Sequence, residues 1–275
     1  MYVGYRIFIS ADMEGTAGIV SSLQVTKGQN DYERGRLLMT REVNAAVEGA
    51  LQAGASEVVV CDGHANMQNI LPEELHPEAK LVRGCIRNSL QMEGIDDSFD
   101  AVMITGAHAG AGTQWGVLDH TWVGSMVYNL RIDGQTLNEA CLNAVVAGYY
   151  GVPVVMVSGD KVTIEQTQAL LPHVEGAVVK EGYSRHSALS LHPDKACALI
   201  REKARLGVQN LGKMEPVQVN NPLTMEIDFF KTDMADAAEL VPGVKRLSAR
   251  TISFTSDPET LFRVHELILF RLRYE

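Results

Sequence analysis

The stretch Ile7-Phe8-Ile9-Ser10-Ala11-Asp12-Met13-Glu14-Gly15 decides the fold. Its apolar first half is typical of a strand that is buried on both faces, as in a parallel sheet. The run stops at Asp12 and Glu14, which cannot lie unpaired in an apolar core because burying an uncompensated charge is costly. At the carboxyl end of a strand, both side chains would instead point into the crevice where open α/β sheets bind ligands. Taken alone, such a segment is more often a strand that ends in a solvated acidic turn, and only the rest of the chain favours a ligand site.

Strand-like and helix-like segments alternate along the chain that follows. Apolar runs predict strands, and 3.6-residue periodicity predicts helices packed on a sheet. The predicted strands span 57–62, 81–84, 101–105, 126–132, 152–160 and 177–180, and the predicted helices span 31–53, 137–150, 164–171 and 194–211. This alternation predicts an α/β domain over residues 1–212, with a parallel-core sheet flanked by helices.

The pattern changes after Pro216. Residues 223–229 alternate like a half-buried strand, a short helix follows at 233–240, and 244–254 resembles two short strands. Asp257 and Pro258 are typical of an N-cap and a first helical position, so a final helix is predicted from Pro258 to Arg273. We therefore predict a smaller α+β domain over residues 213–275, packed on the first.

Composition limits the partners. The chain has 275 residues, is 46% hydrophobic and has a net charge of −10, which argues against nucleic acid or an anionic membrane as the main partner. An acidic surface mildly favours substrates with a free amine. The cysteines are scattered without a C-x-x-C pair, and no segment resembles a signal peptide or a membrane helix, so a cytoplasmic location is predicted. These cysteines are Cys61, Cys85, Cys141 and Cys197.

Potential metal ligands follow three of the predicted strands. Asp12 and Glu14 end the first, His64 follows the strand 57–62, and His108 follows the strand 101–105. Glu139 lies in the first turn of the helix 137–150 and could join them, or could merely complement the helix N-terminus. Three carboxylates and two imidazoles suit Zn²⁺. Five ligands exceed the need of one tetrahedral ion and fit two zinc ions about 3.5–4 Å apart.

The glycine-rich loop around His108, Gly106 to Gly112, has two interpretations. It could cradle a phosphate, but no clear helix follows it and no G-K-[ST] motif is present. We favour a flexible rim that lets His108 approach a metal. A lone histidine after a strand is more often a satisfied polar side chain than a ligand, but His64 would lie at the same edge of the sheet as Asp12 and Glu14.

Several motifs, in order along most of the chain, resemble one known family. They lie at 10–15, 32–36, 62–64, 106–109, 138–144 and 147–154. In these motifs the chain is similar to the DppA-type D-aminopeptidases, peptidase family M55. The resemblance implies a dinuclear zinc site formed by Asp12, Glu14, His64, His108 and Glu139. It also implies that His120 is the catalytic, non-ligand histidine and that subunits form a ring-like homodecamer enclosing the active sites.

The activity implied is release of N-terminal D-amino acids, such as D-alanine, from short peptides by a metal-activated water. His120 would shuttle protons or stabilise the oxyanion, and Asp119 beside it could fix its tautomer. A nucleophilic His120 is an alternative that we favour less. Two other classes stay open: a different metal-dependent α/β hydrolase acting on a phosphorylated or nucleoside substrate, and a non-catalytic oligomeric metal-binding protein. Scarce basic residues near the glycine loop argue against the first, and the complete ligand set against the second.

Overall fold

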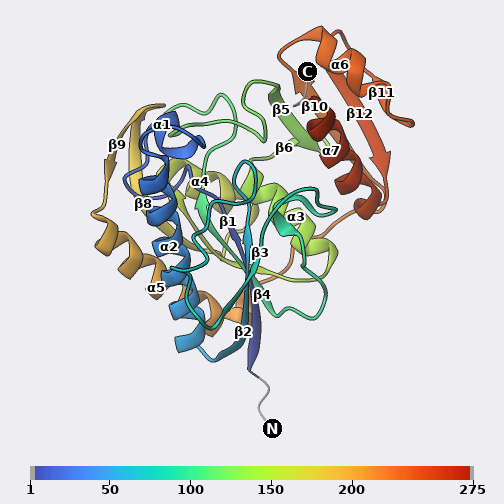
Figure 1. The fold of residues 1–275 in the computed structure, drawn as a ribbon. Helices are drawn as coiled ribbons and strands as arrows, with labels where there is room; N and C mark the ends of the chain where they lie inside the picture. Colours follow the sequence, from blue (N-terminus) through green and yellow to red (C-terminus); the bar gives the residue numbers. More distant parts are fainter. Residues whose placement is uncertain (1–3, 273–275) are drawn as a thin grey trace.

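The computed structural model describes residues 4–272, in which the larger sheet forms the centre of the molecule (Figure 1). Its strand order is β3-β2-β1-β4-β7-β8-β9, and every neighbouring pair is parallel except β8 and β9. The strands are β1 Tyr5–Ala11, β2 Ala55–Asp62, β3 Ala79–Val82, β4 Ala101–Ala107, β7 Val154–Asp160, β8 Glu175–Ser184 and β9 Ser187–Ser190. The predicted parallel-core α/β fold is confirmed.

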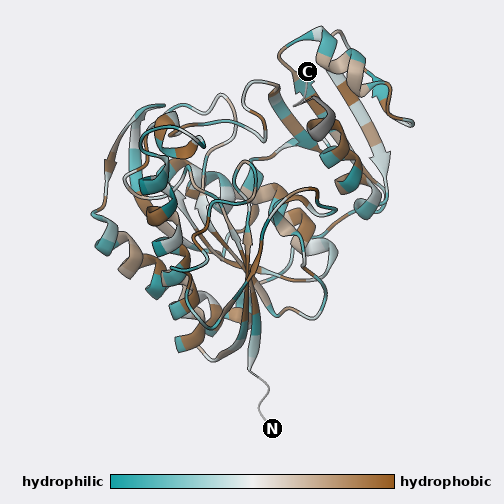
Figure 2. Cartoon of the chain, viewed as in Figure 1, coloured by the Kyte–Doolittle hydropathy of each residue, from teal (hydrophilic) through white to brown (hydrophobic). Residues whose placement is uncertain are grey.

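Strand β1 lies at the point where the strand order reverses, between β2 and β4. Ile7 and Ile9 face one layer of helices, and Phe8 between them faces the other; all three are fully buried. Figure 2 shows the hydrophobic colouring concentrated on these central strands. The carboxyl end of β1 therefore opens at the switch point where α/β sheets bind ligands.

Helices cover both faces of this sheet (Figure 1). α2 Tyr32–Gln52 and α5 Pro193–Gln209 pack together on the face of Ile7, and α3 Glu139–Tyr149 and α4 Lys161–Leu170 lie on the face of Phe8. Short helical turns also occur in the connections, at α1 Ser22–Val25, η1 Leu90–Met92 and η2 Leu211–Lys213.

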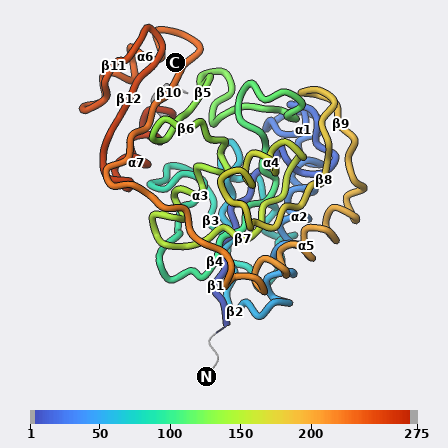
Figure 3. Tube along the Cα trace, turned by 180° about the vertical axis from the view of Figure 1, so that it is seen from behind, coloured from blue at the N-terminus to red at the C-terminus, as the bar shows by residue number. Residues whose placement is uncertain are grey.

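A second, antiparallel sheet lies to one side, seen at the upper right of Figure 1 and from behind in Figure 3. Its order is β11-β12-β10-β5-β6. The strands are β5 Val127–Ile132, β6 Gln135–Thr136, β10 Leu223–Phe229, β11 Lys245–Arg246 and β12 Thr251–Ser256, and the helices are α6 Thr232–Ala238 and α7 Pro258–Leu272. Its buried residues belong to the same core cluster as those of α3, so this unit packs directly on the α/β part.

The hairpin of β5 and β6 lies on the other side of the predicted domain division from the rest of the second sheet. Both strands come from within residues 1–212, yet β5 pairs with β10 of the C-terminal segment. The second sheet is therefore completed by two separate parts of the chain. A division at 212/213 as two domains stays a prediction.

Several elements differ from their predicted bounds for local reasons. α4 begins at Lys161, earlier than predicted, because the Asp160 side chain accepts hydrogen bonds from Thr163. The connection between Gly15 and the helix predicted from residue 31, for which no element was predicted, contains α1, which a capping box at Ser21 stabilises. β8 is longer than predicted because it forms a hairpin with β9. The predicted helix end at Arg273 lies outside the described residues.

Among residues 4–272, no helix combines the length and the apolar character that crossing a bilayer requires.

Candidate metal centre

The loop after β1 lies very close to the carboxyl end of β4 at the crevice. The backbone N–H of Asp12 donates to the carbonyl oxygen of Thr105 at 2.8 Å, and that of Gly15 donates to Gly106 at 2.8 Å. A Cβ atom at Gly15 would lie 1.9 Å from the carbonyl oxygen of Ala107. Glycine at position 15 is therefore a steric requirement of this approach, which holds the loop carrying Glu14 against the end of the strand that leads into His108.

Asp12, Glu14 and His64 form the first cluster of potential metal ligands. The Nδ1 atom of His64 lies 3.1 Å from Oδ1 of Asp12 and 3.0 Å from Oε2 of Glu14. Its Nε2 atom lies 2.7 Å from the carbonyl oxygen of Val25, which can only accept. The proton of neutral His64 therefore belongs on Nε2, and the Nδ1 lone pair faces the two carboxylates.

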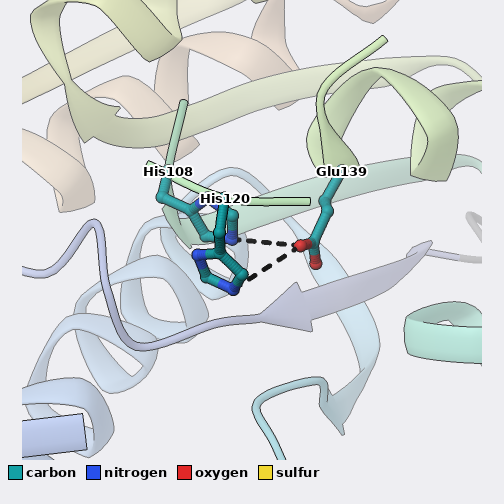
Figure 4. Close-up of side chains that lie close together, drawn as sticks. All are labelled: His108, His120 and Glu139. Carbon is teal, nitrogen blue, oxygen red and sulfur yellow. Dashed lines mark ion pairs between the residues drawn. The ribbon is translucent and has the colours of Figure 1, made fainter. Parts of the chain in front are cut away.

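His108, His120 and Glu139 form the second cluster (Figure 4). Nε2 of His108 lies 3.2 Å from Oε1 of Glu139, and Nε2 of His120 lies 3.9 Å from the same oxygen. The two imidazole rings are stacked, with centroids 4.0 Å apart and planes 10° from parallel. Nδ1 of His108 lies 3.0 Å from the carbonyl oxygen of Ala109, which leaves Nε2 as the nitrogen that faces Glu139.

Asp12 connects the two clusters. Its Oδ1 faces His64, and its Oδ2 lies 3.5 Å from Nε2 of His108. Glu14 also reaches across, since its Oε1 lies 3.9 Å from Nε2 of His120. The structure thus brings all five predicted ligands and the predicted catalytic histidine into one crevice. Which of them bind metal stays a prediction.

The charges in this crevice perturb one another strongly. Burial lowers the pKa of His108, but Glu139 and Asp12 outweigh burial and raise it to about 10. Burial raises the pKa of Glu139, yet the nearby histidines lower it to about 2. Burial and the neighbouring Glu14 raise the pKa of Asp12 to about 7. Buried carboxylates that draw protons onto adjacent imidazoles form an environment that stabilises a cation.

Among the potential ligand atoms, Nε2 of His108 and Oε2 of Glu14 are buried without a well-aligned hydrogen bond, and each lies against another potential ligand, at 3.2 Å from Oε1 of Glu139 and at 3.0 Å from Nδ1 of His64. Buried polar atoms are nearly always satisfied, and a neutral His108 that donates from Nδ1 turns the lone pair of Nε2 towards the Glu139 carboxylate, an arrangement that a bound cation would satisfy. Imidazole nitrogens and carboxylate oxygens are ligands that Zn²⁺ accepts. The residues present therefore fit a zinc site.

The groups that donate hydrogen bonds to Glu139 were not predicted from the sequence. Nε2 of Gln91 donates to Oε2 of Glu139, and the backbone N–H of Trp122 donates to Oε1 at 2.6 Å. Gln91 is itself fixed by Asn143, whose Nδ2 donates to its Oε1 at 2.6 Å. Asn143 stands four residues after Glu139 on a helix, so the two share a face, and this spacing was the available signal.

The predicted role of Asp119 is wrong. Nδ1 of His120 lies 2.8 Å from the carbonyl oxygen of Leu118, which fixes the tautomer with Nε2 towards the carboxylates. The Asp119 carboxylate instead accepts hydrogen bonds from Arg185 and from the backbone N–H of Gly112. Burial, together with the adjacent His108, lowers the pKa of His120.

A cleft of about 490 Å³ opens onto both clusters. The carboxylates, His64 and His120 belong to its lining, and Val25, Met67, Trp122 and Val123 contribute apolar surface. Among the described residues that line the cleft, Lys27 is the one lysine or arginine, so few basic side chains are present there to contact a phosphate. Its volume is in the range of small-molecule sites.

Comparison with known proteins agrees with this geometry. A family model described as D-aminopeptidase matches residues 5–267. A D-aminopeptidase of Bacillus subtilis (strain 168) is 38% identical over 253 residues, which is 90% of each chain. The chain is also similar to the solved structure of the Zn-dependent D-aminopeptidase DppA from Bacillus subtilis, described as a self-compartmentalizing protease. That match has a TM-score of 0.94 and 35% identity and covers 98% of both chains.

Proposed function

Because the chain belongs to the D-aminopeptidase family, we propose that it is a zinc-dependent aminopeptidase that releases N-terminal D-amino acids, such as D-alanine, from short peptides. The observation that carries this proposal is the crevice itself, in which buried carboxylates and imidazoles face one another beside a substrate-sized cleft.

We further propose two zinc ions per subunit, held by Asp12, Glu14, His64, His108 and Glu139. The side chains form two clusters, and Asp12 directs one oxygen to each, as a bridging carboxylate would. Zinc in such a site lowers the pKa of a bound water towards about 7 and polarises a carbonyl oxygen. The hydrogen bonds from Gln91 and Trp122 would hold Glu139 in place for its ion.

His120 is proposed as the catalytic residue that moves protons or stabilises the oxyanion. Its side chain is 18% exposed, more than those of His64 and His108, so it can meet a substrate in the cleft. Leu118 keeps the proton of neutral His120 on Nδ1, and Nε2 is then able to take a proton and return it. The substrate's free amine, being cationic, would be drawn to the carboxylates.

The central test combines metal analysis with substrate turnover. We expect the purified protein to contain zinc and to release D-alanine from D-Ala-D-Ala faster than L-alanine from L-Ala-L-Ala. Removing the metal with a chelator should abolish release, and adding zinc back should restore it. Zinc-loaded protein that cleaves neither dipeptide, or that instead releases phosphate from nucleotides, would contradict the proposed function.

We also propose that subunits assemble into a homodecameric ring in the cytoplasm. The solved relative is described as self-compartmentalizing. Tyr128 and Phe230 pack edge to face on the second sheet while staying 53% and 42% exposed, and such apolar surface suits contact with another copy. Within the described residues, no disulfide joins any of the four cysteines, as is usual in a reducing compartment.

Light scattering tests the assembly. We expect a mass about ten times the 30.0 kDa of one chain, unchanged on dilution through the micromolar range. An obligate ring buries its interfaces, so dilution should not release monomers. A monomer mass at micromolar concentration would refute the ring. A stable mass at another multiple of the chain mass would show that the ring has a different number of subunits.

A further inference from the structure

A buried lysine holds the loop that carries Glu14. Lys180 on β8 is only 2% exposed, and its Nζ atom donates to the carbonyl oxygens of Glu14, Thr16 and Ile19 at 2.5, 2.9 and 2.7 Å. An ammonium group has three donors, so all of them are directed at this one loop. Lys180 therefore has no donor left for a substrate, and its role must be exerted through the loop.

This arrangement satisfies both partners. A buried ammonium is costly unless it is hydrogen-bonded, and carbonyl groups in a non-regular loop need donors that no neighbouring strand supplies. Within the loop itself, the backbone N–H of Thr16 donates to Met13 and that of Ile19 donates to Thr16. The carbonyl oxygen of Thr16 therefore accepts hydrogen bonds from both Ile19 and Lys180, and Lys180 links successive turns of the loop.

Glu42 on α2 holds the same loop by a different atom. Its Oε1 accepts a hydrogen bond from the backbone N–H of Ala17 at 2.8 Å, and the residue is 3% exposed. Burial raises the pKa of Glu42 to about 7, and the Lys180 ammonium opposes that rise. The carbonyl groups of the loop are thus bound by a cation, and an intervening N–H group is bound by a carboxyl group.

We propose that Lys180 and Glu42 are positioning residues that fix the backbone of residues 14–19 and thereby direct the Glu14 carboxylate at the metal crevice. The inference rests on the proposed zinc site. Lys180 binds the carbonyl of Glu14 itself, so its loss displaces the residue directly. Asp12, in contrast, is held at the end of β1 by the hydrogen bond from its backbone N–H to Thr105.

The two zinc ions should therefore respond unequally to a change at position 180. The ion beside Glu14 and His64 depends on the loop, whereas the ion beside His108 and Glu139 is held by β4 and α3. Residues that orient metal ligands typically alter metal affinity by about 10–100-fold. A lysine that merely stabilised the fold would not separate the two affinities.

The experiment is a competition titration of zinc against a chromophoric chelator. In Lys180→Met, which keeps the length of the apolar stem, we expect one of the two affinities to fall by about 10–100-fold and the other to stay within a few-fold. Glu42→Leu should weaken the same ion, and Glu42→Gln, which keeps an acceptor for Ala17, should weaken it less. Arg131→Met is the matched control, because it removes a basic residue bound to Glu226 and Asp228 in the second sheet.

Circular dichroism and thermal unfolding establish that each variant is folded. If Lys180→Met does not fold, the comparison of Glu42→Leu with Glu42→Gln decides instead. Unchanged zinc affinities, or equal weakening of both ions, in a folded variant would overturn the proposal. A wild-type protein that binds no zinc would contradict the proposed function, so the two failures are distinguishable.

Discussion

Replacing Asp12 with alanine is expected to remove zinc and activity together. Asp12 directs Oδ1 towards His64 and Oδ2 towards His108, so its loss removes a ligand from both clusters at once. It also leaves Glu14, His64, His108 and Glu139 without the carboxylate between them. Because residues that only orient ligands already alter affinity or activity by about 10–100-fold, loss of a shared ligand should lower kcat/KM by at least about 100-fold.

Elemental analysis and steady-state kinetics on the same preparation measure both effects. The matched control is Asp194→Ala, since Asp194 is an exposed aspartate that pairs with Arg41 on the surface. That variant should keep its zinc and its turnover, because exposed ion pairs contribute little. Full zinc content in Asp12→Ala would show that Asp12 is not a metal ligand.

The strand that leads into Asp12 was predictable because its sequence pattern is compatible with essentially one arrangement. An apolar run that ends in two carboxylates must bury the run and keep the charges at a polar edge. Strands of a parallel sheet present their carboxyl ends at one edge, so His64 and His108 had to arrive near Asp12 once their strands were identified. The structure places them there, at 3.1 and 3.5 Å from its carboxylate oxygens.

The residues that support the ligands could not be predicted in this way. Lys180 lies 166 positions after Glu14, and a lysine on a predicted strand resembles any surface residue until β8 is placed beside the loop. The tautomer of His120 is set by the carbonyl of Leu118, a group that every residue possesses and that sequence therefore cannot single out. Asp119, the neighbour with a suitable side chain, pairs with Arg185 instead.

The pairing of β5 with β10 was beyond sequence reasoning for a related cause. Antiparallel partners are specified by long-range packing, and nothing local shows that the strand ending at Ile132 will pair with one starting at Leu223. The Arg131 side chain on β5 forms ion pairs with Glu226 and Asp228 on β10, across the paired strands. Such complementary charges become informative only after the register is known.

His120→Ala is expected to keep both zinc ions and to lose turnover. His120 Nε2 lies 3.9 Å from Glu14 and from Glu139, farther than His108 or His64 lies from its nearest carboxylate. A group that moves a proton or stabilises an oxyanion contributes about 100-fold or more to kcat, so kcat should fall by that factor. The measurement is zinc content and kcat on one preparation.

The outcomes of this experiment separate three roles for His120. If His120 is a metal ligand, the His120→Ala variant should lose zinc. If His120 is only a structural residue of its loop, kcat should stay within a few-fold of the wild-type value. His173→Ala is the control, because His173 is an exposed histidine outside the crevice and should change neither quantity. Stacking against His108 at 4.0 Å gives His120→Ala one further expected effect, a small loss of thermal stability without loss of metal. Intact zinc with near-normal turnover would end the catalytic role, because a histidine that faces the cleft from between two carboxylates would then contribute nothing to the chemistry there.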